Sequence, residues 1–364
     1  MHLDSVPVRP GEELNLSSLA DWLRGRIAGA ERGITLQQFP SGHSNLTYLL
    51  QMNEDGREYV LRRGPLGPVA PKAHDMAREF RVLQMVHPHF REAPNVAHLC
   101  EDTAVLGSVF FLMERRHGLI LRDEIPPQLA KTKLPNYPER ASKGFVDCLI
   151  RLHAIDISRT GLIALGRPEG FLERQVQGWA DRWKRAATDD MPKMDRVIRW
   201  LIDHRPSSPA PTLVHNDYKL DNVMFTFSAD SAERIEIEAV LDWEMATVGD
   251  PLADLGLTLC YWAWVEAPQL RARGVPSLTS QPGWYTRDQF VQRYAEGTGR
   301  DLSQIGYYEV LGIFKLAVIL QQIYYRFRRG QTQDTRFQNF GDRVKGLVEL
   351  ADSLIEYPKM GKST

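Results

Sequence analysis

The chain has 364 residues, of which 43% are hydrophobic, so it is long enough and apolar enough to form two domains with a core in each. Its 45 basic residues are balanced by 46 acidic ones, which excludes an overall electrostatic field that would recruit nucleic acid or an anionic membrane. Neither is an expected partner, and the sequence leaves the oligomeric state open.

The cysteines and the N-terminal residues indicate the compartment. Cys100, Cys148 and Cys260 are widely spaced, which makes neither a disulfide framework nor a zinc site. Residues 1–13 contain acidic residues and prolines, where an export signal would have a basic start and an apolar core. We therefore expect a cytoplasmic protein.

Apolar periodicity in the first third of the chain predicts a small sheet with few helices. Amphipathic helices are expected over residues 16–30 and 73–86. Strand patterns bounded by turn residues occupy residues 34–39, 46–51, 58–61, 96–101 and 108–113. These elements predict a mostly antiparallel five-stranded sheet, with the connection to the next domain near Arg116.

The rest of the chain is predicted to be mainly helical. Helices are expected over residues 140–155, 171–187, 192–204, 251–266, 288–297, 302–328 and 336–356, and a hairpin over residues 222–225 and 235–241. The apolar run at residues 316–320 is far shorter than the roughly twenty residues that span a bilayer, so we expect a core helix there. Periodicity alone thus predicts an α+β protein with two domains.

The polar residues around this hairpin form an ordered set. Asp217 is followed five positions later by Asn222, and Asp242 comes directly after the second strand. Kinases use this order, in which the first Asp deprotonates the attacking hydroxyl while the Asn and the second Asp bind Mg²⁺. A single Asp would more often cap a turn or a helix. The complete set instead favours phosphoryl transfer.

The chain resembles the aminoglycoside phosphotransferase and choline kinase-like family of small-molecule kinases. His215-Asn216-Asp217 is similar to the His-Gly-Asp catalytic loop of that family. Leu241-Asp242-Trp243-Glu244, together with Gly249-Asp250-Pro251-Leu252-Ala253-Asp254-Leu255, is similar to its second signature, and the similarity runs from Phe39 to the last helix. Within the family, the chain resembles the kinase-like domains fused to some acyl-CoA dehydrogenases, on the basis of Ser41-Gly42-His43-Ser44-Asn45-Leu46-Thr47-Tyr48 and the stretch 215–222.

The resemblance implies a bilobal, protein-kinase-like fold of the α+β class. Residues 1–115 would form a small antiparallel-sheet lobe that covers the nucleotide phosphates. Residues 116–364 would form the larger helical lobe with the catalytic loop and the substrate site. An enzyme of this kind uses ATP and Mg²⁺ to phosphorylate a hydroxyl group of a small molecule.

Roles in the reaction follow from the resemblance residue by residue. Asp217 would be the catalytic base, Lys219 would contact the transferred phosphoryl group, and Asn222 and Asp242 would bind Mg²⁺. His215 is expected to anchor the loop, and Asp250 and Asp254 to cap and brace a helix start.

A second group of residues would bind the nucleotide. Arg62, in place of the usual Lys, would reach the phosphates and pair with Glu79, although Arg63 competes for this role. Met113, Glu114 and Arg116 would lie in the segment that holds adenine. The loop formed by Ser41, Gly42, His43, Ser44 and Asn45 would cover the phosphates. The alternative interpretation is an ordinary hairpin loop without a role in binding.

The substrate is indicated by composition and, in part, by the resemblance to the dehydrogenase-linked domains. Aromatic residues of the helical domain are interspersed with basic ones, namely Trp179, Trp183, Tyr261, Trp262 and Trp264 with Arg174, Arg182, Lys184 and Arg185. Such aromatics are more often core than pocket, but they suit a polycation poorly. The expected acceptor is a hydroxylated acyl compound, as acid or thioester, with Arg326, Arg328 and Arg329 as candidates for an anionic group.

Alternative functions remain open from the sequence. The chain could be an aminoglycoside phosphotransferase, or a nucleotide-binding pseudokinase that lacks turnover. A protein kinase is disfavoured because the chain passes from Asp242 directly into Asp250-Pro251, without an extended activation segment.

Overall fold

The computed structural model describes residues 4–40, 45–65, 75–122, 124–127, 129, 136–227, 235–262 and 278–356. The chain forms two compact units. The N-terminal unit comprises Met1–His117 and Ala239–Glu244, and the C-terminal unit comprises Gly118–Glu238 and Met245–Thr364.

This division differs from the expected boundary between residues 115 and 116. Arg116 belongs to the N-terminal unit, where its guanidinium donates to the Glu114 carboxylate at 2.8 Å and to the Arg91 carbonyl at 2.9 Å. Residues 239–244 also return to that unit, because the amide of Val240 donates to the carbonyl of Glu92 at 2.7 Å. Pairing between such distant segments leaves no local sequence pattern, so the expected division missed it.

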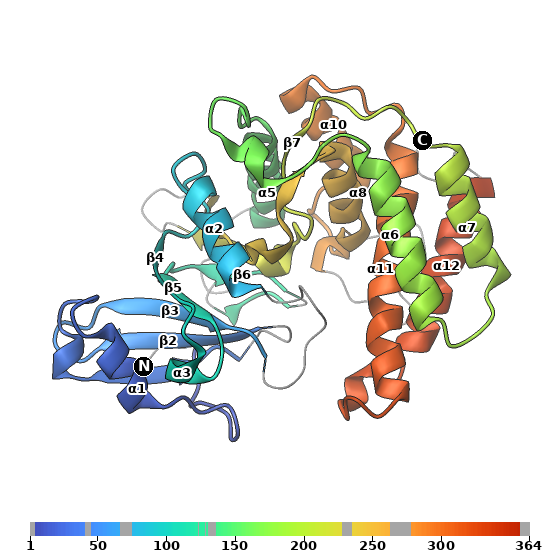
Figure 1. Cartoon of the computed structure of the whole chain (residues 1–364). Coiled ribbons are helices and arrows are strands. Elements are labelled where there is room, and N and C mark those ends of the chain that lie inside the picture. Colours follow the sequence, from blue (N-terminus) through green and yellow to red (C-terminus); the bar gives the residue numbers. More distant parts are fainter. Residues whose placement is uncertain are drawn as a thin grey trace. The chain divides into compact units, whose positions relative to one another are not determined.

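Antiparallel pairing organises the sheet of the N-terminal unit (Figure 1). The strands are β1 (Ile34–Gln38), β2 (Leu46–Met52), β3 (Glu58–Arg63), β4 (Val96–Cys100) and β5 (Phe110–Glu114), in the order β1-β2-β3-β5-β4. The first three form the predicted meander. β5 then pairs with β3 and leaves β4 at the edge of the sheet.

Side chains alternate between the two faces of this sheet along each strand, and both faces have buried residues. On one face, Tyr48 of β2 lies in a core cluster with Leu19 of helix α1 (Leu16–Leu23). On the other face, Phe111 of β5 packs edge-on against Phe80 of α2 (Met76–Val86). Arg62 of β3 is paired with Phe111 in register, so it lies on the α2 face.

The first helix is shorter than predicted. It ends at Leu23, and Gly25 and Gly29 beyond it adopt φ values of 76° and 88°. Glycine populates this left-handed region at little steric cost, and a residue in that conformation ends an α-helix. A 3₁₀ turn, Ala30–Arg32, then leads into β1, and the short helix α3 (Thr103–Leu106) separates β4 from β5.

The described part of the C-terminal unit is mainly helical. Its helices are α5 (Tyr137–His153), α6 (Phe171–Ala186), α7 (Pro192–Asp203), α8 (Pro251–Tyr261), α10 (Arg287–Thr298), α11 (Ile305–Arg328) and α12 (Phe340–Glu356). Short strands lie before and between these helices in the chain: β6 (Leu119–Ile120), β7 (Thr212–Val214), β8 (Val223–Phe227), β9 (Ile235–Val240), whose last two residues belong to the N-terminal unit, and β10 (Thr247–Gly249). The order β6-β8-β9 and the pair β10-β7 form two small sheets. The predicted α+β class is confirmed.

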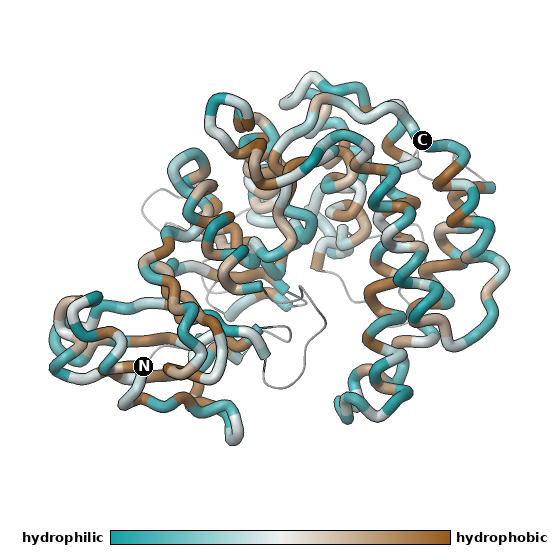
Figure 2. The backbone as a smooth tube through the Cα atoms, viewed as in Figure 1, coloured by the Kyte–Doolittle hydropathy of each residue, from teal (hydrophilic) through white to brown (hydrophobic). Residues whose placement is uncertain are grey.

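Helix α11 is the central element of the C-terminal unit. It contacts α6, α7, α8 and α12 (Figure 1), and hydrophobic stretches recur along it (Figure 2). By length and composition α11 would also pass as a membrane-spanning helix, but half of its apolar window is buried within the protein, as in a core helix. Its approach to α8 is close, because a Cβ on Gly256 would lie 2.2 Å from the carbonyl oxygen of Tyr308.

Candidate active site

The segment with the expected catalytic residues is a loop that follows β7. β7 pairs with β10, with Val214 opposite Thr247, and the chain turns directly after Val214. Asn216 makes this turn with a φ of 64°. Asn tolerates this conformation better than most residues because its short side chain can bond locally, and here its amide nitrogen donates to the Met245 carbonyl at 3.1 Å.

A buried carboxylate fixes the backbone of this loop. Asp254 of α8 accepts the amide of His215 at 2.7 Å and the amide of Asn216 at 2.8 Å, and it is fully buried. His153 of α5 lies 3.2 Å from the same carboxylate. Burial alone would raise the pKa of Asp254, but the hydrogen bond and charge of His153, together with the charge and amide of His215, lower it. Asp254 braces the loop as expected, and Asp250 caps α8 through the amide of Leu252 at 2.8 Å.

The structure brings Asp217, Lys219 and Asn222 together. One carboxylate oxygen of Asp217, Oδ2, accepts from the Asn222 amide nitrogen at 2.9 Å and lies 2.9 Å from the ammonium of Lys219. The Asn222 nitrogen also donates to the Asp217 carbonyl at 3.0 Å. Because the nitrogen of this amide is used twice, its oxygen is the atom left for a metal ion.

Tyr261 completes this cluster, and sequence reasoning missed that contact. Its hydroxyl donates to Oδ1 of Asp217 at 3.2 Å, and the Lys219 ammonium lies 5.1 Å from its ring centroid. Burial, followed by the nearby Asp217 charge, raises the pKa of Tyr261 well above its ordinary value, so the hydroxyl remains a donor. No motif identifies Tyr261, although it follows Asp250, Asp254 and Thr258 along one face of α8.

A second cluster lies within the N-terminal unit. The Arg62 guanidinium is 3.3 Å from the carboxylate of Glu79 and 2.9 Å from that of Asp242, and Glu79 is only 1% exposed. Burial raises the pKa of Glu79, while Arg62 opposes the rise. Arg63 lies on the opposite face of β3 and donates to the Leu106 carbonyl at 3.0 Å. The geometry therefore favours Arg62 over Arg63 as the phosphate-binding candidate.

The phosphate-covering loop is described only at its end. Ser41, Gly42, His43 and Ser44 lie outside the described residues. The amide nitrogen of Asn45 donates to the Glu244 carboxylate at 3.0 Å, and its oxygen is buried without a partner within the described ranges. Asn45 is thereby tied to the segment that carries Asp242.

Comparison with known proteins decides the family. The model of the phosphotransferase enzyme family matches residues 35–306, which is more than half of the chain. The chain belongs to this family. Acyl-CoA dehydrogenase family member 10 of Mus musculus is 33% identical over 95% of the chain, but the match covers 31% of that protein, so the chain spans about a third of the relative's length.

Solved structures support the same assignment. A putative aminoglycoside phosphotransferase from Ralstonia eutropha is 27% identical, with a TM-score of 0.74 over 94% of this chain and 98% of that one. A choline kinase from Cryptosporidium parvum is 14% identical, with a TM-score of 0.61 over 94% of this chain and 97% of that one, which shows a shared fold. The expected kinase-like fold and the resemblance to the kinase-like part of acyl-CoA dehydrogenase relatives are confirmed, and the phosphotransferase is a small-molecule kinase by family.

The segment that is expected to hold adenine is already hydrogen-bonded in part. The amide of Glu114 donates to the Asn95 carbonyl at 2.9 Å, and the amide of Asn95 donates back to the Glu114 carboxylate at 2.6 Å. The Glu114 amide is thus unavailable as a donor to adenine. Met113 is 6% exposed within β5. The adenine role of Met113, Glu114 and Arg116 stays a prediction.

The aromatic residues expected near the substrate are mostly core. Trp179, Trp183 and Trp262 of the phosphotransferase are buried, and Trp262 stacks edge-on with Phe290. Trp264 lies outside the described residues. Arg326, Arg328 and Arg329 are exposed at the end of α11. Of the aromatic set, Tyr261 alone contacts a predicted catalytic residue within the described ranges.

Proposed function

We propose that this phosphotransferase transfers the γ-phosphoryl group of ATP, with Mg²⁺, to a hydroxyl group of a small hydroxylated acyl compound. The observation that carries the proposal is the Asp217 carboxylate. Asn222 and Lys219 contact its Oδ2, Tyr261 donates to its Oδ1, and Asp254 fixes the backbone just before it. A carboxylate held in this way is suited to accept the proton of an attacking hydroxyl.

Each residue then has a chemical role. Asp217 accepts a hydrogen bond from the acceptor hydroxyl and takes its proton during transfer. Lys219, already 2.9 Å from Asp217, neutralises negative charge on the transferred group. Arg62 binds the phosphates of ATP, which requires its guanidinium to share or leave its contact with Asp242.

The proposed metal ligands are the side-chain oxygens of Asn222 and Asp242. Mg²⁺ prefers oxygen donors and keeps several waters beside ATP phosphates, so an amide and a carboxylate suit it. When bound, Mg²⁺ neutralises charge on the phosphates. Asp242 is 28% exposed on its side chain, so a ligand from solvent can reach it.

The acceptor class is supported by relatives and by charge. The relative from mouse is named for acyl-CoA dehydrogenation, which supports an acyl substrate here. An aminoglycoside is a polycation and requires acidic groups around the reacting hydroxyl. On α6 the structure instead places the exposed basic residue Arg182, whose guanidinium lies 4.6 Å from the ring centroid of Trp179.

The proposal is tested with γ-labelled ATP, Mg²⁺ and a panel of acceptors. The panel contains short- and medium-chain hydroxy fatty acids, their CoA thioesters, and aminoglycosides. Label should enter the hydroxyacyl compounds. Labelling of aminoglycosides alone would favour the runner-up function, to which the similarity with the Ralstonia protein points. Binding of ATP without transfer to any acceptor would favour a pseudokinase.

A further inference from the structure

A lysine lies in the interior of the C-terminal unit, in the middle of helix α11. Lys315 is 7% exposed, and Phe314 before it and Ala317 two residues after it are buried as well. Removing an ammonium group from water is costly unless it is paired or hydrogen-bonded, so a lysine at such a core position requires a specific partner.

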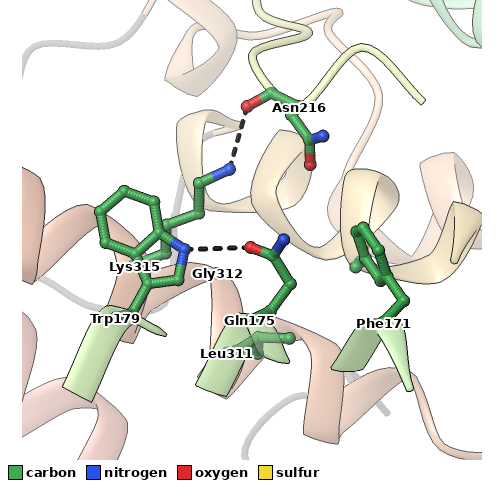
Figure 3. A pocket seen from close by; sticks show the side chains of 8 residues that line it. Phe171, Gln175, Trp179, Asn216, Leu311, Gly312 and Lys315 are labelled. Carbon is green, nitrogen blue, oxygen red and sulfur yellow. Dashed lines mark hydrogen bonds between the residues drawn. The ribbon is translucent and has the colours of Figure 1, made fainter. Parts of the chain in front are cut away.

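The partner of Lys315 is the catalytic loop. Its ammonium donates to the backbone carbonyl of Asn216 at 3.1 Å and lies 5.6 Å from the ring centroid of Trp179 on α6. Figure 3 shows the lysine reaching from α11 toward Asn216, with Trp179 alongside. These groups border a small cavity of about 10 Å³, which has room for about one water molecule. The space is too small for a substrate, so the lysine acts on the protein itself.

Lys315 and Asp254 hold the same short stretch of backbone from two helices. Asp254 of α8 accepts the amides of His215 and Asn216, and Lys315 of α11 donates to the carbonyl of Asn216. Asn216 has a φ of 64°, a sparsely populated conformation that persists only where its surroundings enforce it. The next residue is Asp217, so the direction of its carboxylate depends on this peptide.

The charges around Lys315 agree with such a role. The charged or titratable groups that face it are Asp254 and Cys260 of α8, Asp217 of the loop and Arg182 of α6. Burial lowers the pKa of Lys315 to about 8, while Asp254 and Asp217 oppose the fall. The ammonium form is therefore retained near neutral pH, beside the carboxylate of the proposed base.

We propose that Lys315 is a positioning residue for phosphoryl transfer, whose ammonium holds the Asn216 carbonyl so that the Asp217 carboxylate faces the acceptor hydroxyl. This inference rests on the proposed function. A lysine that serves stability alone would behave differently, because replacing a buried charge by an apolar side chain of similar length often leaves a protein as stable or more stable.

The test compares Lys315→Met with Lys315→Arg and with Lys345→Met, which changes an exposed lysine of α12. Lys315→Met should lower kcat about 10- to 100-fold with the KM for ATP unchanged, since displacement of a catalytic group by about 1 Å has effects of this size. Its melting temperature should stay close to that of the wild type. Lys315→Arg should recover part of the rate, and Lys345→Met should match the wild type. A wild-type kcat in Lys315→Met, or a loss of rate that follows a loss of melting temperature, would overturn the inference.

Hydrogen exchange tests the same inference without turnover. Amides of residues 213–222 should exchange about tenfold faster or more in Lys315→Met than in the wild type and in Lys345→Met, because the loop loses one of its anchors. Unchanged exchange there would contradict the positioning role. If the wild type transfers no label to any acceptor, the proposed function fails, but this comparison still decides whether Lys315 holds the loop.

Discussion

Two of the three described non-glycine residues with a left-handed backbone lie at the proposed site. Among the described residues, the non-glycine positions with positive φ are Asn136, Asn216 and Asp242. Asn216 precedes the proposed base, and Asp242 is a proposed metal ligand. Such conformations cost of order 1–3 kcal/mol and cluster at functional sites, where the surrounding structure enforces them. The hydrogen bonds to Asp254, Lys315 and Arg62 supply that enforcement here.

Replacing Arg62 by Lys tests the nucleotide side of the site. One guanidinium nitrogen, Nη2, contacts both Glu79 and Asp242, whereas bidentate binding of a phosphate would use the planar fork of donors, which a lysine lacks. We expect Arg62→Lys to raise the KM for ATP about tenfold, as measured by steady-state kinetics. Arg63→Lys is the matched control, because its guanidinium is bonded to the Leu106 carbonyl. If Arg63→Lys changed the KM for ATP and Arg62→Lys did not, the assignment would be reversed.

The buried ammonium of Lys315 makes stability depend on pH. Burial lowers its pKa from 10.5 to about 8, so between these values the unfolded chain binds a proton that the folded chain has released. The free energy of unfolding should therefore rise with pH in this window, by up to about 1.4 kcal/mol per pH unit. Lys315→Met lacks this contribution.

Urea denaturation of both proteins at about pH 7 and about pH 9.5 measures the effect. The wild type should gain stability relative to Lys315→Met at the higher pH. A difference between the two proteins that does not change with pH would show that the lysine is not desolvated in the folded state.

Helix α8 is the element that organises the catalytic loop. Along one face, Asp250 caps the helix, Asp254 binds the loop amides, Thr258 donates to the Tyr218 carbonyl at 3.0 Å, and Tyr261 donates to Asp217. These positions are spaced by three or four residues, the period of a helix face. Displacement of α8 would therefore disturb the base and its supports together.

The close contact between α8 and α11 gives a test at this scale. A Cβ on Gly256 would lie 2.2 Å from the carbonyl oxygen of Tyr308, which the helix backbones can relieve only by moving apart. We expect Gly256→Ala to destabilise the protein by about 2 kcal/mol or more and to lower kcat as well. Thermal unfolding and kinetics measure both.

Gly306→Ala is the control on α11, because a Cβ there meets nothing within 4 Å. It should be neutral or stabilise the protein by up to about 1 kcal/mol, since alanine is the better helix former. Equal stability of Gly256→Ala and Gly306→Ala would show that the two helices are not closely packed.

Local sequence patterns predicted most helices and strands, because apolar residues repeat with a different period in amphipathic helices than in alternating strands. Strands β7 and β10 were missed, since each has three residues, too few for a period to show. The contacts of Tyr261 and Lys315 with the loop could not be predicted either. They join positions 44 and 99 residues apart, and only tertiary packing brings such positions together.

The sequence predicted which residues form the candidate site, but not all of the contacts between them. Asp217 with Asn222 was expected from motif order, and Arg62 with Glu79 from the family resemblance. The structure places each pair in contact. The bond from Arg62 to Asp242 was not expected. It depends on the return of residues 239–244 to the N-terminal unit, which the sequence does not mark.

At the scale of the whole molecule, binding of the proposed nucleotide and metal should stabilise the folded state. MgATP should therefore raise the melting temperature, because a ligand that binds the folded state at about 100 times its Kd stabilises it by about 2.7 kcal/mol. For units of this size the rise should be several degrees. Differential scanning fluorimetry measures it.

The rise should shrink when EDTA replaces Mg²⁺, and also in Asp242→Ala, which loses a proposed metal ligand. A rise of equal size with and without Mg²⁺ would contradict the metal assignment. A rise that persists in Asp242→Ala would remove Asp242 from the metal site.

The central claim is that Asp217 activates the acceptor hydroxyl. The most direct measurement is the single-turnover rate of label transfer from γ-labelled ATP to the best acceptor, in the wild type, in Asp217→Asn and in Asp221→Asn. Asp221 is the control, an exposed carboxylate of the same loop. We predict a loss of about 100-fold or more in Asp217→Asn and a rate near that of the wild type in Asp221→Asn. A wild-type rate in Asp217→Asn would contradict the account.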